Sequence, residues 1–523
     1  MGSNHPSIHK YLVLLGLLLG ALWLPALPSL GGEGSRGEPT RTSLSVTPTP
    51  SPAPPFVPPT PSLRKTLTIV DFRVHPDGPL YEGDRLSFEV EVRNTGALPL
   101  NGARVEIRRG NGLASEILAE ALLPELAPGA SHRTVWTWVW EARPAGSFSL
   151  IAMARPPEEG LQVGDSVTRT LFLRPEGMLP EAERRARWAQ AESRCCSHIY
   201  LTGTAAERDL PQLMAWADEA EAAVRARLGV PARLSTQIVW IPRLLGQGGF
   251  TVGDSLILTY PLSDRLPADL PTILRHELTH RMTCAWLERE DCLAHLPSFI
   301  LEGMAVFVAG GHYRPEPLPL RAAALLHMGQ WIPLDRLVEG FYTHPHEIGY
   351  LEAGAFVEEL VREGGWPRFR AFLRAMERRP GETDRELLDR ALRAVYHQSI
   401  QGMEARWLER LRGLPVDPDQ IADLQFTVAF YEALRAYQRT YDPSAYFLGT
   451  WLPDWREAVR ERIVADFMRE PEDPEGEWFW QRLQDARRRA AIGDVQGARE
   501  ILRALCERWA NERGFGDRCS NPE

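Results

Sequence analysis

The chain has 523 residues, enough for about three domains of ordinary size. Hydrophobic residues make up 44% and charged residues 24%, a mix typical of globular proteins with sizeable cores. The formal net charge is −10, with 69 acidic against 59 basic residues. This balance argues against nucleic acid as the main partner, because there is no basic surplus to neutralise phosphates.

The N-terminus carries an apolar run at residues 11–24, which follows Lys10 and stops before Pro25. The run is too short to span a bilayer comfortably and is typical of the core of a signal peptide. We therefore predict an export segment at residues 1–31, with an uncleaved membrane anchor as the alternative. Residues 32–62 are so rich in Pro, Thr and Ser that they predict a disordered stalk. Both features place the protein outside the cytoplasm, either secreted or held at the cell surface.

Between residues 63 and 175 the sequence changes to short runs in which apolar and polar residues alternate. In RLSFEVEVRN, residues 85–94, every second side chain is apolar, which predicts a half-buried strand. Similar runs occupy residues 66–74, 132–141 and 147–155. Because turn signals separate the runs, we predict an antiparallel β-sandwich. The stretches VEVRNTG, LAPGASHRTVWTW and PAGSFSLIAMA resemble CARDB-type, immunoglobulin-like (Ig-like) modules, which implies a spacer or an adhesive unit.

From residue 180 onward helical periodicity dominates. Residues 210–228 place apolar side chains on one face of a helix. Strands are expected at residues 198–204, 236–242 and 255–262. We predict an α+β, mostly helical domain at residues 180–410 and an α-helical region at residues 411–523. Residues 478–509 resemble a single TPR-type hairpin, which we interpret as a packing appendage.

Six cysteines in an exported chain permit disulfides. The pairs close enough in sequence to join locally are Cys284 with Cys292 and Cys506 with Cys519. The adjacent residues Cys195 and Cys196 are expected not to pair with each other, because the ring that they would close is strained. No CxxC spacing exists, so a zinc site made of four cysteines is not expected.

The segment RHELTH is the first candidate for chemistry. On a helix, His276 and His280 lie one turn apart, so both imidazoles project from one face and can share a tetrahedral ion. Glu277 lies beside them, where it can take a proton from a water that the metal makes more acidic. Asp269 as N-cap and Pro271 in the first turn favour a helix here. The alternative is a solvated helix with two unrelated histidines.

A candidate for the third ligand is Glu302, in the otherwise apolar segment PSFILEGMAVFVAG. Burying this carboxylate without a partner would cost on the order of several kcal/mol. Zinc bound by two imidazoles would be such a partner, and Gly303 would let the backbone approach the first helix closely. The alternatives are an exposed Glu302 or a buried pair with an arginine. Glu352 and His295 are weaker candidates for the same position.

HExxH followed by an E-G-x-A helix resembles the gluzincin peptidases, and in particular the peptidase MA-like group. The match on the second helix is FILEGMA, with Phe299 where that group usually has Trp. The resemblance implies a zincin-like catalytic domain that binds Zn2+. The ligands that it implies are His276, His280 and Glu302, with Glu277 as the general base.

Residues 349–376 also resemble this group, whose members often have a tyrosine before a helix of small residues. Tyr350 is therefore our candidate for the donor that stabilises the oxyanion, and the alternative is a tyrosine that packs at a helix start. His344 and His346 precede it and either line the cleft or are solvated. An edge strand within residues 249–260 is expected to pair with an extended peptide.

Together these patterns predict an exported zinc metallopeptidase that hydrolyses peptide or protein substrates. One alternative is a non-catalytic surface-binding or adhesion protein that keeps a structural zinc. The other is a metal-free scaffold in which His276 and His280 are incidental. Zinc content and the effect of Glu277→Gln on cleavage separate the three.

Overall fold

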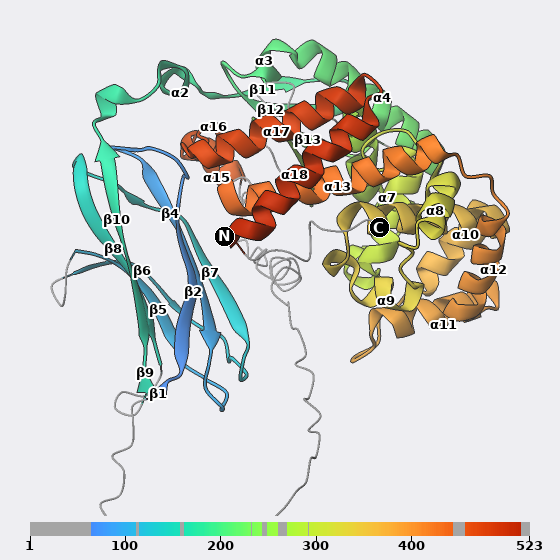
Figure 1. Ribbon diagram of the computed structural model, residues 1–523, viewed down its shortest axis with the longest axis horizontal. Coiled ribbons are helices and arrows are strands. Elements are labelled where there is room, and N and C mark those ends of the chain that lie inside the picture. Colours follow the sequence, from blue (N-terminus) through green and yellow to red (C-terminus); the bar gives the residue numbers. More distant parts are fainter. Residues whose placement is uncertain are drawn as a thin grey trace, which may run out of the picture.

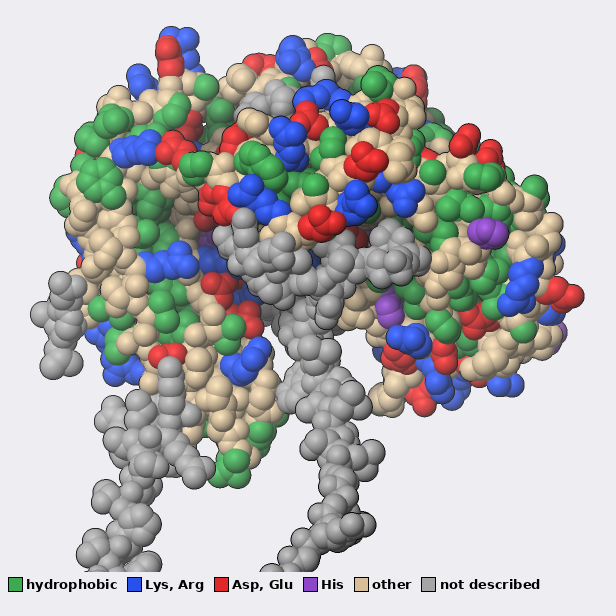
Figure 2. Space-filling model, viewed as in Figure 1, with side chains coloured by type: hydrophobic (Ala, Val, Ile, Leu, Met, Phe, Trp, Pro, Cys, Tyr) green, Lys and Arg blue, Asp and Glu red, His purple; other side chains and the backbone are tan. Residues whose placement is uncertain are grey.

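The computed structural model describes residues 64–110, 115–156, 162–231, 233–242, 248–259, 269–290, 292–442 and 455–513. Sheets form the N-terminal part of the chain and helices most of the C-terminal part (Figure 1). The predicted export segment and stalk lie outside the described residues. Within the described ranges, no helix is both long and apolar enough to cross a membrane. On the face shown in Figure 2, acidic and basic side chains are interspersed, in keeping with their near-equal numbers.

Two sheets packed face to face form the N-terminal unit, with strand orders β2-β4-β7 and β3-β10-β8-β5-β6. Their strands are β2 (Leu67–His75), β3 (Leu80–Tyr81), β4 (Arg85–Asn94), β5 (Arg104–Arg109), β6 (Glu116–Leu122), β7 (Ser131–Glu141), β8 (Gly146–Arg155) and β10 (Asp165–Arg174), beside a short pair β1 (Arg64–Lys65) and β9 (Gln162–Val163). Leu86, Phe88 and Val90 of β4 are fully buried in the shared core, as the period of two predicts. The opposite face of β4 is less exposed than expected, because Glu89 is buried and pairs with Arg133 at 2.7 Å.

A further sheet, outside the sandwich, has the order β11-β12-β13-β15-β14. Its strands are β11 (Trp188–Glu192), β12 (Cys196–Leu201), β13 (Thr236–Ile241), β14 (Gly249–Val252) and β15 (Ser255–Thr259). The three central strands are parallel, and the two edge strands β11 and β14 run antiparallel to their neighbours. Helices α4 (Leu210–Leu228) and α5 (Leu270–Leu287) pack their apolar residues against buried Trp240 and Leu256 of this sheet. The expected strands and the helix between the first two are all present.

The remaining helices are η2 (Glu176–Met178), α2 (Glu181–Arg185), α3 (Ala205–Arg208), α6 (Cys292–His295), α7 (Ser298–Ala309), α8 (Leu318–His327), α9 (Leu334–Glu339), η3 (Phe341–Thr343), α10 (His346–Ala375), α11 (Asp384–Tyr396), α12 (Ile400–Arg412), α13 (Pro418–Tyr441), α15 (Trp455–Arg460), α16 (Ala465–Met468), α17 (Pro474–Ala491) and α18 (Val495–Arg513). Helices α6 to α12 continue the same core, while α15 and α16 belong to a second apolar cluster and α17 and α18 pack with α13 in a third. A Cβ on Gly303 of α7 would lie 2.5 Å from the carbonyl oxygen of Ala353. Gly303 therefore permits a close approach to α10, not to α5 as the sequence suggested.

The segment that contains α15 and α16 joins the sandwich to the sheet formed by β11 to β15. Trp138 of β7 donates from its indole N–H to Asp466 Oδ2 at 3.1 Å. Arg469 forms buried ion pairs with Asp84 of the sandwich and with Glu183. An apolar cluster shared by the three parts surrounds these contacts. The sandwich is thus docked on the helical half through the C-terminal part of the chain.

Two disulfides join described cysteines. Cys284 and Cys292 are bonded, as expected, and link α5 to α6. Cys195 and Cys196 are bonded to each other, so the expectation that neighbouring cysteines would not pair is wrong. The turn before β12 holds this pair, because the Cys195 N–H donates to Asp218 Oδ1 at 2.8 Å. The expected partner of Cys506, Cys519, lies outside the described residues.

Candidate metal centre

Helix α5 carries the HExxH residues as the sequence predicts. Asp269 is its N-cap and accepts a hydrogen bond from the Thr272 N–H at 3.0 Å, and Pro271 lies in the first turn. His276 and His280 are one turn apart on the same face, with their ring centroids 4.9 Å apart. Both imidazoles therefore point toward one place.

Helix α7 brings Glu302 to that place. Glu302 Oε2 lies 3.1 Å from His276 Nε2 and 3.3 Å from His280 Nε2, and the two imidazole nitrogens are 3.2 Å apart. A tetrahedral zinc ion with bonds of about 2.0–2.1 Å needs donor atoms about 3.3–3.4 Å apart. The three atoms therefore fit three corners of such a tetrahedron, and two neutral imidazoles with one carboxylate suit zinc chemically. We call His276, His280 and Glu302 the first cluster.

The first cluster is largely but not fully enclosed. Side-chain exposure is 9% for His276 and 14% for both His280 and Glu302. Burial raises the pKa of Glu302, but the two imidazoles outweigh that effect and hold its pKa well below the usual range. Burial lowers the pKa of His276. The cluster thus favours the ionised carboxylate and a neutral His276, whereas the Glu302 carboxylate raises the pKa of His280 in spite of its burial.

Glu277 points toward the edge strand β14. Its Oε2 accepts a hydrogen bond from Thr251 Oγ1 at 2.7 Å, and burial raises its pKa. Gly249 lies two residues before Thr251 on the same face of the strand, and a Cβ there would be 3.3 Å from Glu277 Oε1 and 2.5 Å from Leu258 Cδ2. Glycine therefore lets the edge strand lie close to the Glu277 carboxylate. The Thr251 contact could not be predicted from the sequence, because the two residues are 26 positions apart.

Two tyrosines lie near the first cluster. Tyr342, which the sequence did not single out, donates from its hydroxyl to Glu302 Oε1 at 2.9 Å. Tyr350, the predicted oxyanion donor, is buried with its ring centroid 6.2 Å from that of His276. Its ring is stacked 4.2 Å from His312 and 4.3 Å from His346. The role of Tyr350 stays a prediction.

The weaker candidates lie elsewhere. Glu352 is fully buried and accepts from the Ile332 N–H at 2.9 Å. Neither Glu352 nor His295 belongs to a group of potential metal ligands among the described residues. His344 and His346 differ from each other, because His344 is partly exposed while His346 is buried beside Tyr350.

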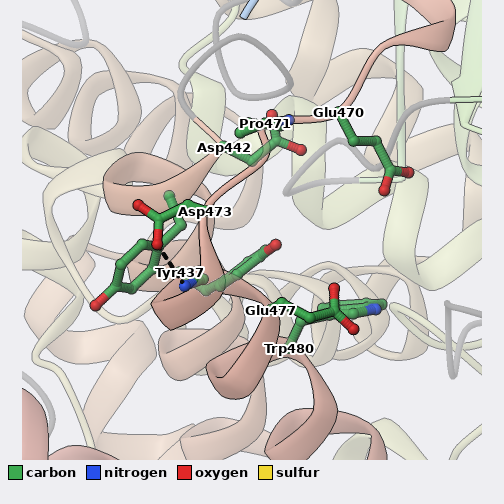
Figure 3. A pocket seen from close by; sticks show the side chains of 9 residues that line it. Tyr437, Asp442, Glu470, Pro471, Asp473, Glu477 and Trp480 are labelled. Atoms are coloured by element: carbon green, nitrogen blue, oxygen red, sulfur yellow. Dashed lines mark hydrogen bonds between the residues drawn. The ribbon is translucent and has the colours of Figure 1, made fainter. Parts of the chain in front are cut away.

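A separate pocket lies among the C-terminal helices (Figure 3). Acidic and aromatic side chains line it, namely Tyr437, Tyr441, Asp442, Glu470, Asp473, Glu477 and Trp480. Asp473 is the N-cap of α17 and accepts hydrogen bonds from the Glu475 and Gly476 N–H groups at 2.9 and 3.0 Å. None of the predicted site residues lines this pocket, and we assign no chemistry to it.

No family model matches the chain, and no curated protein matches it. Among solved structures, it is similar to the CARDB domain of a Pyrococcus furiosus protein in complex with di-metal ions, with 17% identity over 21% of this chain and 87% of that one and a TM-score of 0.17. It is also similar to an M1 zinc metallopeptidase from Deinococcus radiodurans, with 15% identity over 68% of this chain and 96% of that one and a TM-score of 0.31. A third neighbour is a β-D-glucoside glucohydrolase from Trichoderma reesei, with 16% identity over 21% of this chain and 19% of that one and a TM-score of 0.15. At TM-scores this low, none of these likenesses carries weight for the function of this chain.

Proposed function

We propose that the protein is a zinc-dependent peptidase. The observation that supports this most directly is the triangle of donor atoms from His276, His280 and Glu302, with sides of 3.1–3.3 Å. Three protein ligands leave one of four positions free, which is typical of catalytic zinc sites, whereas structural sites have four protein ligands. Glu277 lies beside the triangle and completes the set of groups that peptide hydrolysis needs.

The residues of the site have separate tasks. His276, His280 and Glu302 would hold Zn2+, which when bound acidifies water and polarises a peptide carbonyl. Glu277 would take the proton from the attacking water and pass it to the leaving amine. The hydrogen bond from Thr251 fixes the direction of the Glu277 carboxylate. Tyr342 holds Glu302 by its other oxygen, which orients the third ligand.

We further propose that the edge strand β14 binds the substrate. Among the described strands, β14 pairs only with β15, so its other edge can pair with an extended peptide by backbone hydrogen bonds. The strand also contacts Glu277 through Thr251, so a peptide bound along it would have its backbone next to the first cluster. This arrangement favours peptide or protein substrates over small molecules.

The setting that we propose is extracellular. The apolar run at residues 11–24 and the Pro-rich residues 32–62 favour export or anchoring by an N-terminal segment, followed by a stalk. The sandwich would act as a CARDB-like, Ig-like spacer between the stalk and the catalytic domain. Substrates would then be peptides or proteins outside the cell.

The alternative is a non-catalytic surface-binding protein with a structural zinc at the same residues. The two proposals differ in the need for Glu277, because this residue is not a ligand. We would measure zinc content and the digestion of a peptide library by wild type and Glu277→Gln. The peptidase proposal expects both proteins to carry zinc at the first cluster and the variant to lose about 10²–10⁴-fold in rate. Equal cleavage by both proteins, or cleavage by neither, would overturn it.

A further inference from the structure

A second cluster of two histidines and one glutamate lies next to the first. His312 follows α7, and His346 and Glu347 begin α10. His312 Nδ1 is 2.7 Å from Glu347 Oε2, and one donor atom from each of the three residues lies within 4.8 Å of the others. All three side chains are almost completely buried, at 5%, 5% and 1% exposure. We call His312, His346 and Glu347 the second cluster.

The second cluster leaves buried polar atoms without partners. Among the described residues, neither nitrogen of the His346 ring has a hydrogen-bond partner, and neither does Glu347 Oε1. Buried polar atoms are nearly always satisfied, and each one left alone costs about 1–3 kcal/mol. One nitrogen of a neutral His346 ring and Glu347 Oε1 each offer a lone pair, so a single missing partner that accepts lone pairs would satisfy two of these three atoms. A metal cation is a partner of this kind.

Contacts outside the second cluster hold its histidines in place. A Cβ on Gly311 would lie 1.8 Å from the carbonyl oxygen of Arg314, so only glycine fits the tight loop that presents His312. The His346 N–H donates to Glu432 Oε1 at 2.9 Å, which fixes the start of α10. The ring of Tyr350 packs against both imidazoles. Both histidines are thus held from outside the cluster.

The charges around the second cluster nearly balance. The neighbouring cations are Arg314, Arg321, Arg435 and Arg439, and the carboxylates are Glu302, Glu316, Asp423, Glu432 and Glu347 itself. Arg314 and Arg321 both form ion pairs with Asp423. With the first cluster empty, the surroundings therefore do not carry a net positive charge that would repel a cation.

Without a cation, the second cluster would be a neutral hydrogen-bonded pair. The contact of 2.7 Å between His312 Nδ1 and Glu347 Oε2 would then be one hydrogen bond between a carboxyl and an imidazole. Such a pair satisfies Glu347 Oε2 and His312 Nδ1. It leaves His346 with no partner and does not explain why a second imidazole is placed there.

We propose that His312, His346 and Glu347 form a second metal site, separate from the first cluster, that takes Zn2+ or a similar first-row divalent ion. Two imidazole nitrogens and one carboxylate oxygen are a donor set that suits these ions. Such an ion needs donor atoms about 3.3 Å apart. The His312–Glu347 distance of 2.7 Å is shorter than this, and the 4.8 Å within which all three donor atoms lie is longer. The side chains therefore adjust on binding. Full burial makes this a structural ion.

The second ion would not act with the first as a two-metal catalytic pair. Such pairs lie about 3.5–4 Å apart and share ligands. Here the ring centroids of His276 and His312 are 6.0 Å apart, and each histidine belongs to a different cluster. The Tyr350 ring, 6.2 Å from His276, lies next to both clusters. The second ion would therefore fix the wall of the candidate active site without touching substrate.

The test is the amount of zinc bound by full-length protein after equilibrium dialysis against zinc chloride, measured by elemental mass spectrometry. We expect about two ions for wild type and about one for His346→Asn and for Glu347→Gln. Glu302→Gln should also retain about one, and the double variant Glu302→Gln/Glu347→Gln about none. His344→Asn is the matched control, because His344 is a nearby histidine outside both clusters, and it should keep about two.

The outcomes separate the second site from the proposed function. Wild type with about one ion, or both second-cluster variants with about two, would overturn the second site and leave the peptidase proposal standing. Glu347→Gln keeps the size of the side chain, so a variant with an unchanged circular dichroism spectrum and half the zinc cannot be explained by misfolding. Cobalt substitution gives a second reading, because His346→Asn should remove one of two visible absorption components. A spectrum that His346→Asn leaves unchanged would also overturn the proposal.

Discussion

Two clusters with the same donor set, two histidines and one glutamate, lie side by side in the helical half of the molecule. They differ in exposure to solvent and in how many of their polar atoms have a hydrogen-bond partner. In the first cluster all three donor atoms are 3.1–3.3 Å apart, and its side chains keep 9–14% exposure. In the second, two donor atoms are in contact, three atoms have no partner within the described part of the chain, and exposure is at most 5%. The donor set alone therefore does not decide the chemistry. Access to solvent and to substrate decides the chemistry of each cluster.

The difference follows from the elements that carry each cluster. The first is built on two helices, α5 and α7, whose fixed spacing sets the distances between donors. The second is built on the loop after α7 and on the first turn of α10, under a cover of aromatic rings. Glu302 and His312 lie near opposite ends of α7 and its loop, so this one segment takes part in both. A site between packed helices can open to a cleft, whereas one beneath stacked rings stays closed.

Removal of metal gives the largest expected effect. A chelator should take the ion of the first cluster quickly, because that cluster is partly exposed, and peptidase activity should fall to zero in the same phase and return with zinc. The ion of the second cluster should leave far more slowly, since its release requires local unfolding. Zinc release followed with a chromogenic chelator should therefore show two phases. Two ions released in a single fast phase would contradict the difference in burial.

The two tyrosines give the next effect. If Tyr350 stabilises the oxyanion, Tyr350→Phe should lower kcat by about 10²–10³-fold and leave zinc content unchanged. Tyr342→Phe loses the 2.9 Å hydrogen bond to Glu302, so it should weaken zinc binding about 10–100-fold instead. The two variants differ from wild type by one oxygen each and serve as controls for each other. The opposite pattern, with kcat lost in Tyr342→Phe, would move the oxyanion role to Tyr342.

Sequence reasoning found the residues whose spacing is local. A period of two predicted β2, β4, β7 and β8, and the i, i+4 spacing put His276 and His280 on one face. Glu302 was found because a charge stands alone in an apolar helix. These signals depend on neighbours within a turn or two of the chain, which the sequence displays directly.

The residues that were missed depend on contacts between distant segments. The sequence predicts only that His346 lines the cleft or is solvated, and its contact with His312, 34 positions earlier in the chain, depends on the fold. The partner of Tyr342 is 40 residues away. Gly303 was singled out correctly but given the wrong neighbour, because a glycine shows that a close approach occurs and not which helix makes it. The Cys195–Cys196 bond depends on a turn held by Asp218, which composition does not reveal.

Asp466 is, like Glu347, a buried carboxyl with one oxygen that has no hydrogen-bond partner among the described residues. Burial raises the pKa of Asp466 from 3.8 to about 6, so the folded protein holds a proton that the unfolded chain releases. Its contribution to stability is therefore present below about pH 4 and lost as pH rises through 6, a change of about 3 kcal/mol. Asp466→Asn should raise the free energy of unfolding by up to about 3 kcal/mol at pH 8 and leave it unchanged at pH 4.

At neutral pH with zinc present, Glu347→Gln should lower the free energy of unfolding, which is the opposite of the effect expected for Asp466→Asn. If the second cluster binds a metal, the variant loses that ion and is less stable than wild type by the binding energy of the ion. If Glu347 is simply a protonated carboxyl like Asp466, its replacement by an amide should leave stability unchanged or raise it. Denaturant unfolding of both variants with and without zinc decides between these outcomes. If both substitutions stabilise the protein, the second cluster does not bind a metal.

The smallest expected effect concerns Thr251, which contacts the first cluster through Glu277 and has no counterpart in the second. Thr251→Val keeps the shape and the strand preference of the side chain but removes the hydrogen bond to Glu277 Oε2. The carboxylate is then free to turn away from the attacking water, so kcat should fall about 10-fold while KM and zinc content stay the same. Thr251→Ser restores a hydroxyl and should recover most of the rate. An unchanged kcat in Thr251→Val would mean that Glu277 needs no orientation from the edge strand, and then β14 would be linked to the site only through the peptide that we propose it binds.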